Sequence, residues 1–73
     1  MRKATLTFSL STDTRVAHIG PWFADLRVNG RQHTRVGTDQ MMRDFLVEVV
    51  ATCAAHDVTL EVRNDTLGKL SLA

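Results

Sequence analysis

Hydrophobic and polar positions alternate strictly over residues 5–10, and the same period of two recurs over residues 58–63 and, apart from Phe23, over residues 22–28. This period of two is typical of strands that bury one face and expose the other. The first stretch alternates leucine and phenylalanine with threonine and serine, which predicts an apolar inner face and a polar outer face. We therefore expect three half-buried strands, separated by turn-forming segments.

Asn29-Gly30 follows the second predicted strand and is a strong signal for a hairpin. A two-residue turn would place three polar side chains on the same sheet face as Leu26: Arg31, His33 and Arg35. Burying such groups without partners is costly. The sequence therefore favours a longer loop.

A three-residue loop over residues 29–31 avoids that cost. It places Asp25 opposite Arg35 on the outer face, which is a favourable cross-strand pair. It also turns Val36 toward the core. We predict this register, with Gly30 in the left-handed conformation and the third strand ending at Gly37.

Helical spacing begins after Gly37 and continues to about His56. Thr38 is a suitable N-cap, and Asp39 places negative charge in the first turn, where the helix dipole favours it. The apolar positions form one stripe with two residues at its edges. The stripe comprises Met42, Phe45, Leu46, Val49 and Cys53, with Met41 and Val50 at the edges.

The order of elements is β-β-β-α-β, and residues 1–73 form a single domain. We predict an α+β fold, a two-layer sandwich in which one amphipathic helix covers a three- to five-stranded, mostly antiparallel sheet. Residues 64–73 form either a short closing strand or a loose tail. The open sheet face should present Thr5, Thr7, Ser9, Phe23, Asp25, Arg27, His33, Arg35, Thr59, Glu61 and Arg63.

Composition narrows the class of protein. The 73 residues are 44% hydrophobic, which is too apolar for a disordered chain, and a single cysteine excludes an internal disulfide. No apolar run reaches membrane-spanning length, and the first ten residues alternate where a signal sequence would be continuously apolar. We therefore expect a soluble, cytoplasmic protein. We also expect it to be a monomer.

The net charge is +1, but it is unevenly distributed. Residues 1–36 carry a net charge of +4, and residues 37–73 carry −3. Two interpretations follow: the halves attract one another within the domain, or the surface meets partners of both signs.

Catalytic and metal-binding patterns are missing. Cys53 and His56 lie three residues apart, but His18 and His33 belong to other elements, and zinc needs three or four convergent ligands. No nucleophile motif, phosphate-binding glycine loop or dinucleotide fingerprint occurs. We expect no metal, no cofactor and no enzymatic activity, with Cys53 buried and unreactive.

Adjacent aromatic residues favour a protein partner instead. Trp22 and Phe23 cannot both point toward the core from one strand, so one is expected at the surface, where aromatic residues anchor interfaces. The alternative is that Trp22 covers the open end of the core. We predict partner binding by Trp22 or Phe23, with Asp13, Asp25 and Arg27 at the rim.

A nucleic-acid interface is the alternative from a different class of function. The hairpin over residues 27–35 carries basic side chains that could follow a phosphate backbone. RNA-binding sheets also place several aromatic residues on the open face, and here only Phe23 is clearly placed there.

The short, cysteine-poor chain, with one helix on a small sheet and no catalytic motif, resembles phage-encoded host-takeover proteins. In chain length and order of elements it is similar to the small RNA-polymerase-binding regulators of Xanthomonas-infecting phages. The resemblance implies binding to bacterial RNA polymerase in the host cytoplasm, inhibition of initiation by displacing sigma, and antitermination. An inhibitor of a host nuclease or defence complex is a further alternative.

Overall fold

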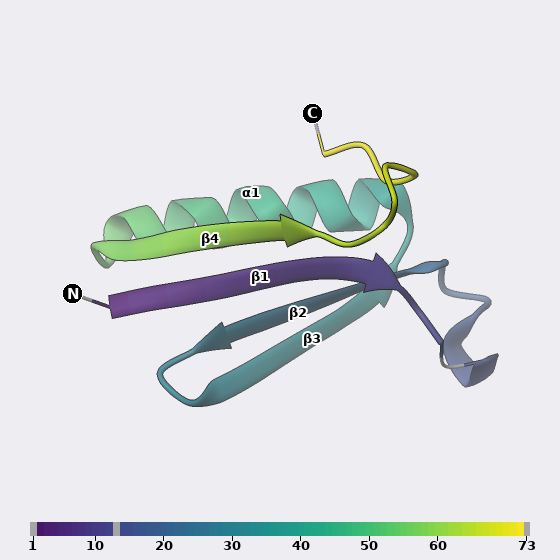
Figure 1. Cartoon of the computed structure of the whole chain (residues 1–73), viewed down its shortest axis with the longest axis horizontal. Helices are drawn as coiled ribbons and strands as arrows, with labels where there is room; N and C mark the ends of the chain where they lie inside the picture. The colour runs from purple at the N-terminus through teal and green to yellow at the C-terminus, as the bar shows by residue number, and fades with distance from the viewer. Residues whose placement is uncertain (1, 13, 73) are drawn as a thin grey trace.

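The computed structural model describes residues 2–12 and 14–72, and it contains four strands and one long helix (Figure 1). The elements follow the predicted order, with one short 3-10 turn in addition. They are β1 (Arg2–Leu10), η1 (Thr14–Val16), β2 (Trp22–Val28), β3 (Arg31–Gly37), α1 (Asp39–Ala55) and β4 (Val58–Asn64).

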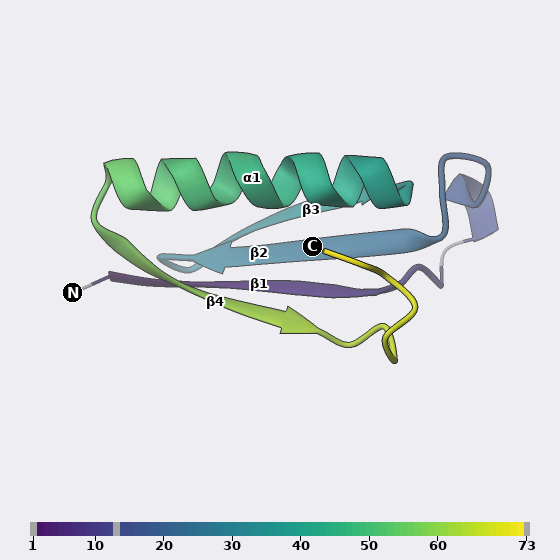
Figure 2. The same ribbon diagram turned by 90° about the horizontal axis from the view of Figure 1, so that it is seen from above.

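The sheet has the strand order β3-β2-β1-β4, and α1 lies along one of its faces (Figure 2). β1 pairs antiparallel with β2, and β2 pairs antiparallel with β3, whereas β4 is parallel to β1. A parallel strand needs a crossover connection, which α1 provides between β3 at one edge and β4 at the other. The α+β class and the β-β-β-α-β order are confirmed, with a mixed four-stranded sheet.

The core lies between the inner sheet face and α1. Leu6 and Phe8 are fully buried, as their alternation in β1 predicts. The helix begins after Thr38, whose hydroxyl accepts a hydrogen bond from the Met41 backbone at 3.3 Å, so the predicted N-cap is confirmed. The buried core residues are Ala4, Leu6, Phe8, Trp22, Ala24, Met42, Phe45, Val49 and Leu70.

The hairpin does not have the predicted three-residue loop. Val28 lies directly opposite Arg31, so the turn contains only Asn29 and Gly30. Both turn residues have positive φ, 53° and 76°, which is the conformation required by a two-residue type I′ turn. Asn-Gly is the preferred sequence for that turn, and its backbone preference decides the register.

The shorter turn reverses the faces assigned to β3. Asp25 lies opposite Thr34 rather than Arg35, and Val36 lies opposite Phe23 on the open face instead of pointing inward. His33 and Arg35 are therefore on the helix side of the sheet. The expected burial cost does not arise, because β3 is an edge strand whose residues 31–35 all remain exposed.

The loop between β1 and β2 closes tightly against the start of the helix. The backbone N–H of Ser11 donates to the carbonyl of Pro21 at 2.8 Å. A Cβ atom placed on Gly20 would lie 2.2 Å from the carbonyl carbon of Gly37, so only glycine fits there. No helix in the described part of the chain is long and apolar enough to cross a membrane.

The segment after β4 is neither a strand nor a loose tail. Leu70 is 3% exposed and belongs to the core, and Thr66 is 4% exposed. The Asn64 amide donates to the Leu70 carbonyl at 3.1 Å, and the Leu70 N–H donates to the Thr66 hydroxyl at 3.2 Å. These contacts hold an irregular segment against the end of the sheet.

Candidate functional site

The predicted binding residues do not form one surface. Phe23, Asp25 and Arg27 share the open face of β2, where Phe23 is half-buried. Trp22 points to the opposite face, and Asp13 lies outside the described residues. The structure therefore brings three of the five residues together.

Trp22 occupies the core rather than the surface. Its side chain is 7% exposed, and its indole N–H donates to the carboxylate of Asp39 at the start of α1. A buried tryptophan needs a partner for this polar atom, and Asp39 satisfies it. Of the two interpretations of Trp22, the structure shows the core position, so only Phe23 of the pair faces solvent.

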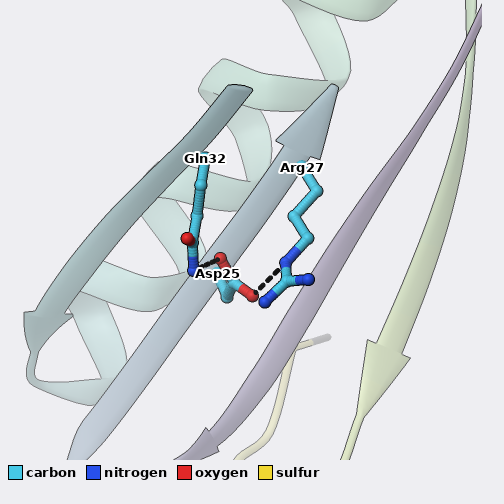
Figure 3. Close-up of polar contacts among 3 residues, drawn as sticks. All are labelled: Asp25, Arg27 and Gln32. Atoms are coloured by element: carbon cyan, nitrogen blue, oxygen red, sulfur yellow. Dashed lines mark hydrogen bonds and ion pairs between the residues drawn. The ribbon is translucent and has the colours of Figure 1, made fainter. Parts of the chain in front are cut away.

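Asp25 is engaged within the protein. Its carboxylate accepts from Arg27 Nε at 3.0 Å and from Gln32 Nε2 at 3.0 Å (Figure 3). Its side chain is 17% exposed, whereas that of Arg27 is 69% exposed. On this face Arg27 is thus the charge more available to a partner.

The basic residues of the hairpin divide between the two faces. Arg27 lies on the open face, whereas three side chains lie on the helix side because of the two-residue turn. These three are Arg31, His33 and Arg35. The hairpin therefore offers one row of three basic or imidazole groups along β3, rather than the expected Arg27, His33 and Arg35 together on the open face.

A groove of about 650 Å³ lies between the second half of α1 and the β2–β3 hairpin. Its floor comes from the inner faces of β1 and β2, with Leu26 and Val28 as its larger apolar side chains. The helix wall includes Phe45, Val49 and Cys53. This size is within the range of protein sites that bury small ligands or the side chains of a partner.

The rim of the groove is mostly basic. Two arginines and two histidines line it against a single carboxylate: Arg2, Arg35, His33, His56 and Glu48. The Arg35 guanidinium lies 5.1 Å from the centroid of the Phe45 ring, which is cation–π geometry. The groove thus combines an apolar floor with positive charge at its edge, a combination suited to an acidic and partly apolar segment.

Cys53 departs from the sequence expectation. It is half-buried and lines the groove instead of being enclosed in the core. His56 lines the same groove one turn later. Within the described residues, no group of three or more histidine, cysteine, aspartate or glutamate side chains is arranged to hold a metal ion.

Sequence reasoning missed the groove because it assigned the wrong face to β3. The signal was present in Asn29-Gly30, whose preferred two-residue turn sets the observed register. The position of α1, which leaves residues 31–35 of β3 exposed, has no signature in the local sequence.

No protein-family model matches the chain, and no curated protein or solved structure matches it significantly. The groove, its charge and the exposed strands are therefore the basis for a proposed function.

Proposed function

We propose that this protein is a non-enzymatic binding module that holds an acidic, partly apolar segment of a protein partner in the groove between α1 and the β2–β3 hairpin. The observation that carries the proposal is the apolar floor beneath a mostly basic rim. Apolar contacts would supply affinity, and the rim charges would supply orientation and partner choice.

Bacterial RNA polymerase is the first partner to test, because the chain resembles small phage regulators of that enzyme. On this proposal the protein would act in the host cytoplasm, inhibiting initiation and favouring antitermination. Arg35 is the central residue, since it touches Phe45 and also lines the groove. The open-face residues Phe23 and Arg27 form a second candidate contact.

The test is calorimetric titration of purified core polymerase and of polymerase with sigma. We expect Arg35→Glu to weaken binding about tenfold or more, because it reverses a charge at the rim. Arg63→Glu is the matched control: it makes the same charge change at an exposed residue of β4 that does not line the groove. Circular dichroism verifies that both variants fold.

Equal binding by Arg35→Glu and the unmodified protein would contradict binding of the partner in the groove. Loss of binding by Arg27→Glu alone would move the interface to the open sheet face, which Arg27 shares with Phe23. No complex with polymerase at micromolar concentration would exclude this partner.

Nucleic acid is the second candidate, favoured by the row of Arg31, His33 and Arg35 along β3. Salt dependence separates the two. Binding through phosphates weakens steeply and linearly with the logarithm of salt concentration, with a slope close to the number of phosphates neutralised. A shallow dependence with polymerase, together with no binding to plain DNA or RNA, would favour the protein partner.

A further inference from the structure

We propose that the free edge of β3 accepts an extended acidic segment of a partner protein as a fifth strand of the sheet. The proposal rests on the proposed function in taking the partner to be a protein, and it names how that partner is held. Strand addition gives affinity through backbone hydrogen bonds and specificity through alternate side chains.

β3 is suited to this role because it is long, regular and open. It is the terminal strand in the order β3-β2-β1-β4, and all seven of its residues pair with β2 in unbroken register. Residues 31–35 are exposed. Edge strands are commonly protected by proline, a bulge, a short length or charged side chains. β3 has only the last of these, in Arg31 and Arg35, which disfavour a basic incoming strand and favour an acidic one.

The turn also fixes which backbone groups face the free edge. In a two-residue turn the residues on either side, Val28 and Arg31, form a hydrogen-bonded pair, and bonded and non-bonded pairs then alternate along the ladder. The backbone N–H and C=O groups that point away from β2 therefore belong to Gln32, Thr34 and Val36.

The side chains of β3 define the charge of the incoming strand. Its helix-side row contains Arg31, His33 and Arg35, so a neighbouring strand would set alternate side chains beside these groups. Opposite charges in cross-strand positions are favourable, and like charges are not. The partner should therefore carry Asp or Glu at alternate positions, with β-branched residues between them, beside Thr34 and Val36.

The other edge strand offers no comparable row. β4 carries both signs on its open face, in Glu61 and Arg63. The Glu61 carboxylate already forms an ion pair within the protein, because Lys3 Nζ lies 3.1 Å from Glu61 Oε2. The segment after β4 also folds back onto the strand end, where Asn64 donates to Leu70.

A second copy of this chain is not the occupant. Pairing β3 with another β3 would set the same basic row against itself, which is unfavourable. The acidic residues of the sequence also never occur two positions apart, so no segment of this chain has the required alternation. The incoming strand therefore belongs to a different protein.

The direct test uses the peptide fluorescein-Gly-Thr-Glu-Val-Glu-Val-Glu-Thr-amide, labelled at its N-terminal amine, titrated with the protein and followed by anisotropy. Only one alternate set of peptide N–H groups can face β3. The two sets are the N–H groups of the two valines and those of the three glutamates. We expect N-methylation of the set that faces β3 to weaken binding at least tenfold, while N-methylation of the other set changes the affinity by no more than about twofold. Equal effects of the two sets, or no binding of the unmethylated peptide, would overturn the proposal.

A variant and an exchange measurement test the same edge on the protein side. Thr34→Pro removes a donor that faces away from β2, a position where edge strands tolerate proline, and should abolish peptide binding with the circular dichroism spectrum retained. If this variant unfolds, amide hydrogen exchange of the unmodified protein still tests strand addition at β3. Saturating peptide should slow exchange at Gln32, Thr34 and Val36, and unchanged exchange there would contradict strand addition.

The two proposals can fail separately. If Arg35→Glu weakens polymerase binding but the peptide leaves exchange along β3 unchanged, the groove stands and strand addition is wrong. If the peptide protects β3 and polymerase does not bind, strand addition stands and polymerase is the wrong partner.

Discussion

Trp22 shows how one side chain connects the two layers of the fold. Its ring fills the core, and its indole N–H donates to Asp39, the first residue of α1. The carboxylate therefore accepts this hydrogen bond, and its negative charge also interacts favourably with the positive end of the helix dipole. The same contact ties β2 to the start of the helix.

Trp22→Phe should keep most of the buried ring but remove the donor. We expect the free energy of unfolding to fall by about 1 to 2 kcal/mol, because a buried polar contact is lost and a smaller ring fills the site. Urea unfolding followed by circular dichroism measures this, since the variant has no tryptophan fluorescence.

A double-mutant cycle with Asp39→Ala separates the hydrogen bond from the packing. The coupling energy should be about 1 kcal/mol if the two groups interact as described. Purely additive effects of the two substitutions would contradict the contact.

At the scale of elements, the register of the β2–β3 hairpin is set by competition between the backbone preference of the turn and the burial of side chains. Asn29 and Gly30 both adopt positive φ, which a two-residue turn requires. The opposing cost, three polar side chains on the inner face, is small because the edge strand is not covered. The turn preference therefore sets the register, which places Arg31, His33 and Arg35 in one exposed row on β3.

Paired cysteines test this register in a Cys53→Ala background. Arg27 and Gln32 lie directly opposite one another on the open face, so cysteines at both positions should form a disulfide readily. Closing this short loop should add about 2 kcal/mol to the free energy of unfolding. Mass spectrometry after mild oxidation detects the bond.

The competing register makes a distinct prediction. A three-residue loop would set Arg27 opposite His33, so cysteines at those two positions would cross-link instead. In the structure these residues lie on opposite faces of the sheet, and we expect that pair to remain reduced under the same conditions.

The segment after β4 contributes to stability through Leu70. Leu70→Ala should lower the free energy of unfolding by about 2 to 5 kcal/mol, because the side chain is buried in the core. Leu67→Ala is the matched control: Leu67 is 92% exposed, and the change should stay within about 0.5 kcal/mol. Thermal and urea unfolding compare the two, and similar losses would contradict the packing of this segment.

At the scale of the whole molecule, the groove exists because α1 and the hairpin diverge. No single element contains it: its floor comes from β1 and β2, and its walls come from the hairpin and α1. The basic rim likewise combines Arg2 at the start of the chain with Arg35 and His56. Its chemistry is therefore a product of tertiary placement.

Cys53 provides a reporter of this groove. Because it is half-buried and lines the groove, we expect a thiol reagent to label it without global unfolding, so the rate should depend only weakly on urea. A saturating partner should slow labelling several-fold by covering the groove. A labelling rate that rises with urea as steeply as global unfolding, or that ignores the bound partner, would contradict this placement.

Much of the fold was predictable from the sequence because it depends on local patterns. Alternation placed β1, β2 and β4, and the Thr38 N-cap with its apolar stripe placed α1. These features follow from backbone geometry and side-chain burial within one element, so neighbouring residues determine them. The α+β class followed from their order.

Tertiary structure decided what depends on which surfaces are covered. The inward row of β3 is acceptable only because α1 leaves that edge exposed, and the indole N–H of the buried Trp22 has a partner only because Asp39 lies within its reach. Leu70 joins the core although no periodic pattern surrounds it. Each outcome depends on contacts between residues far apart in the chain, and a local pattern records which side chains need burial but not where another element will lie.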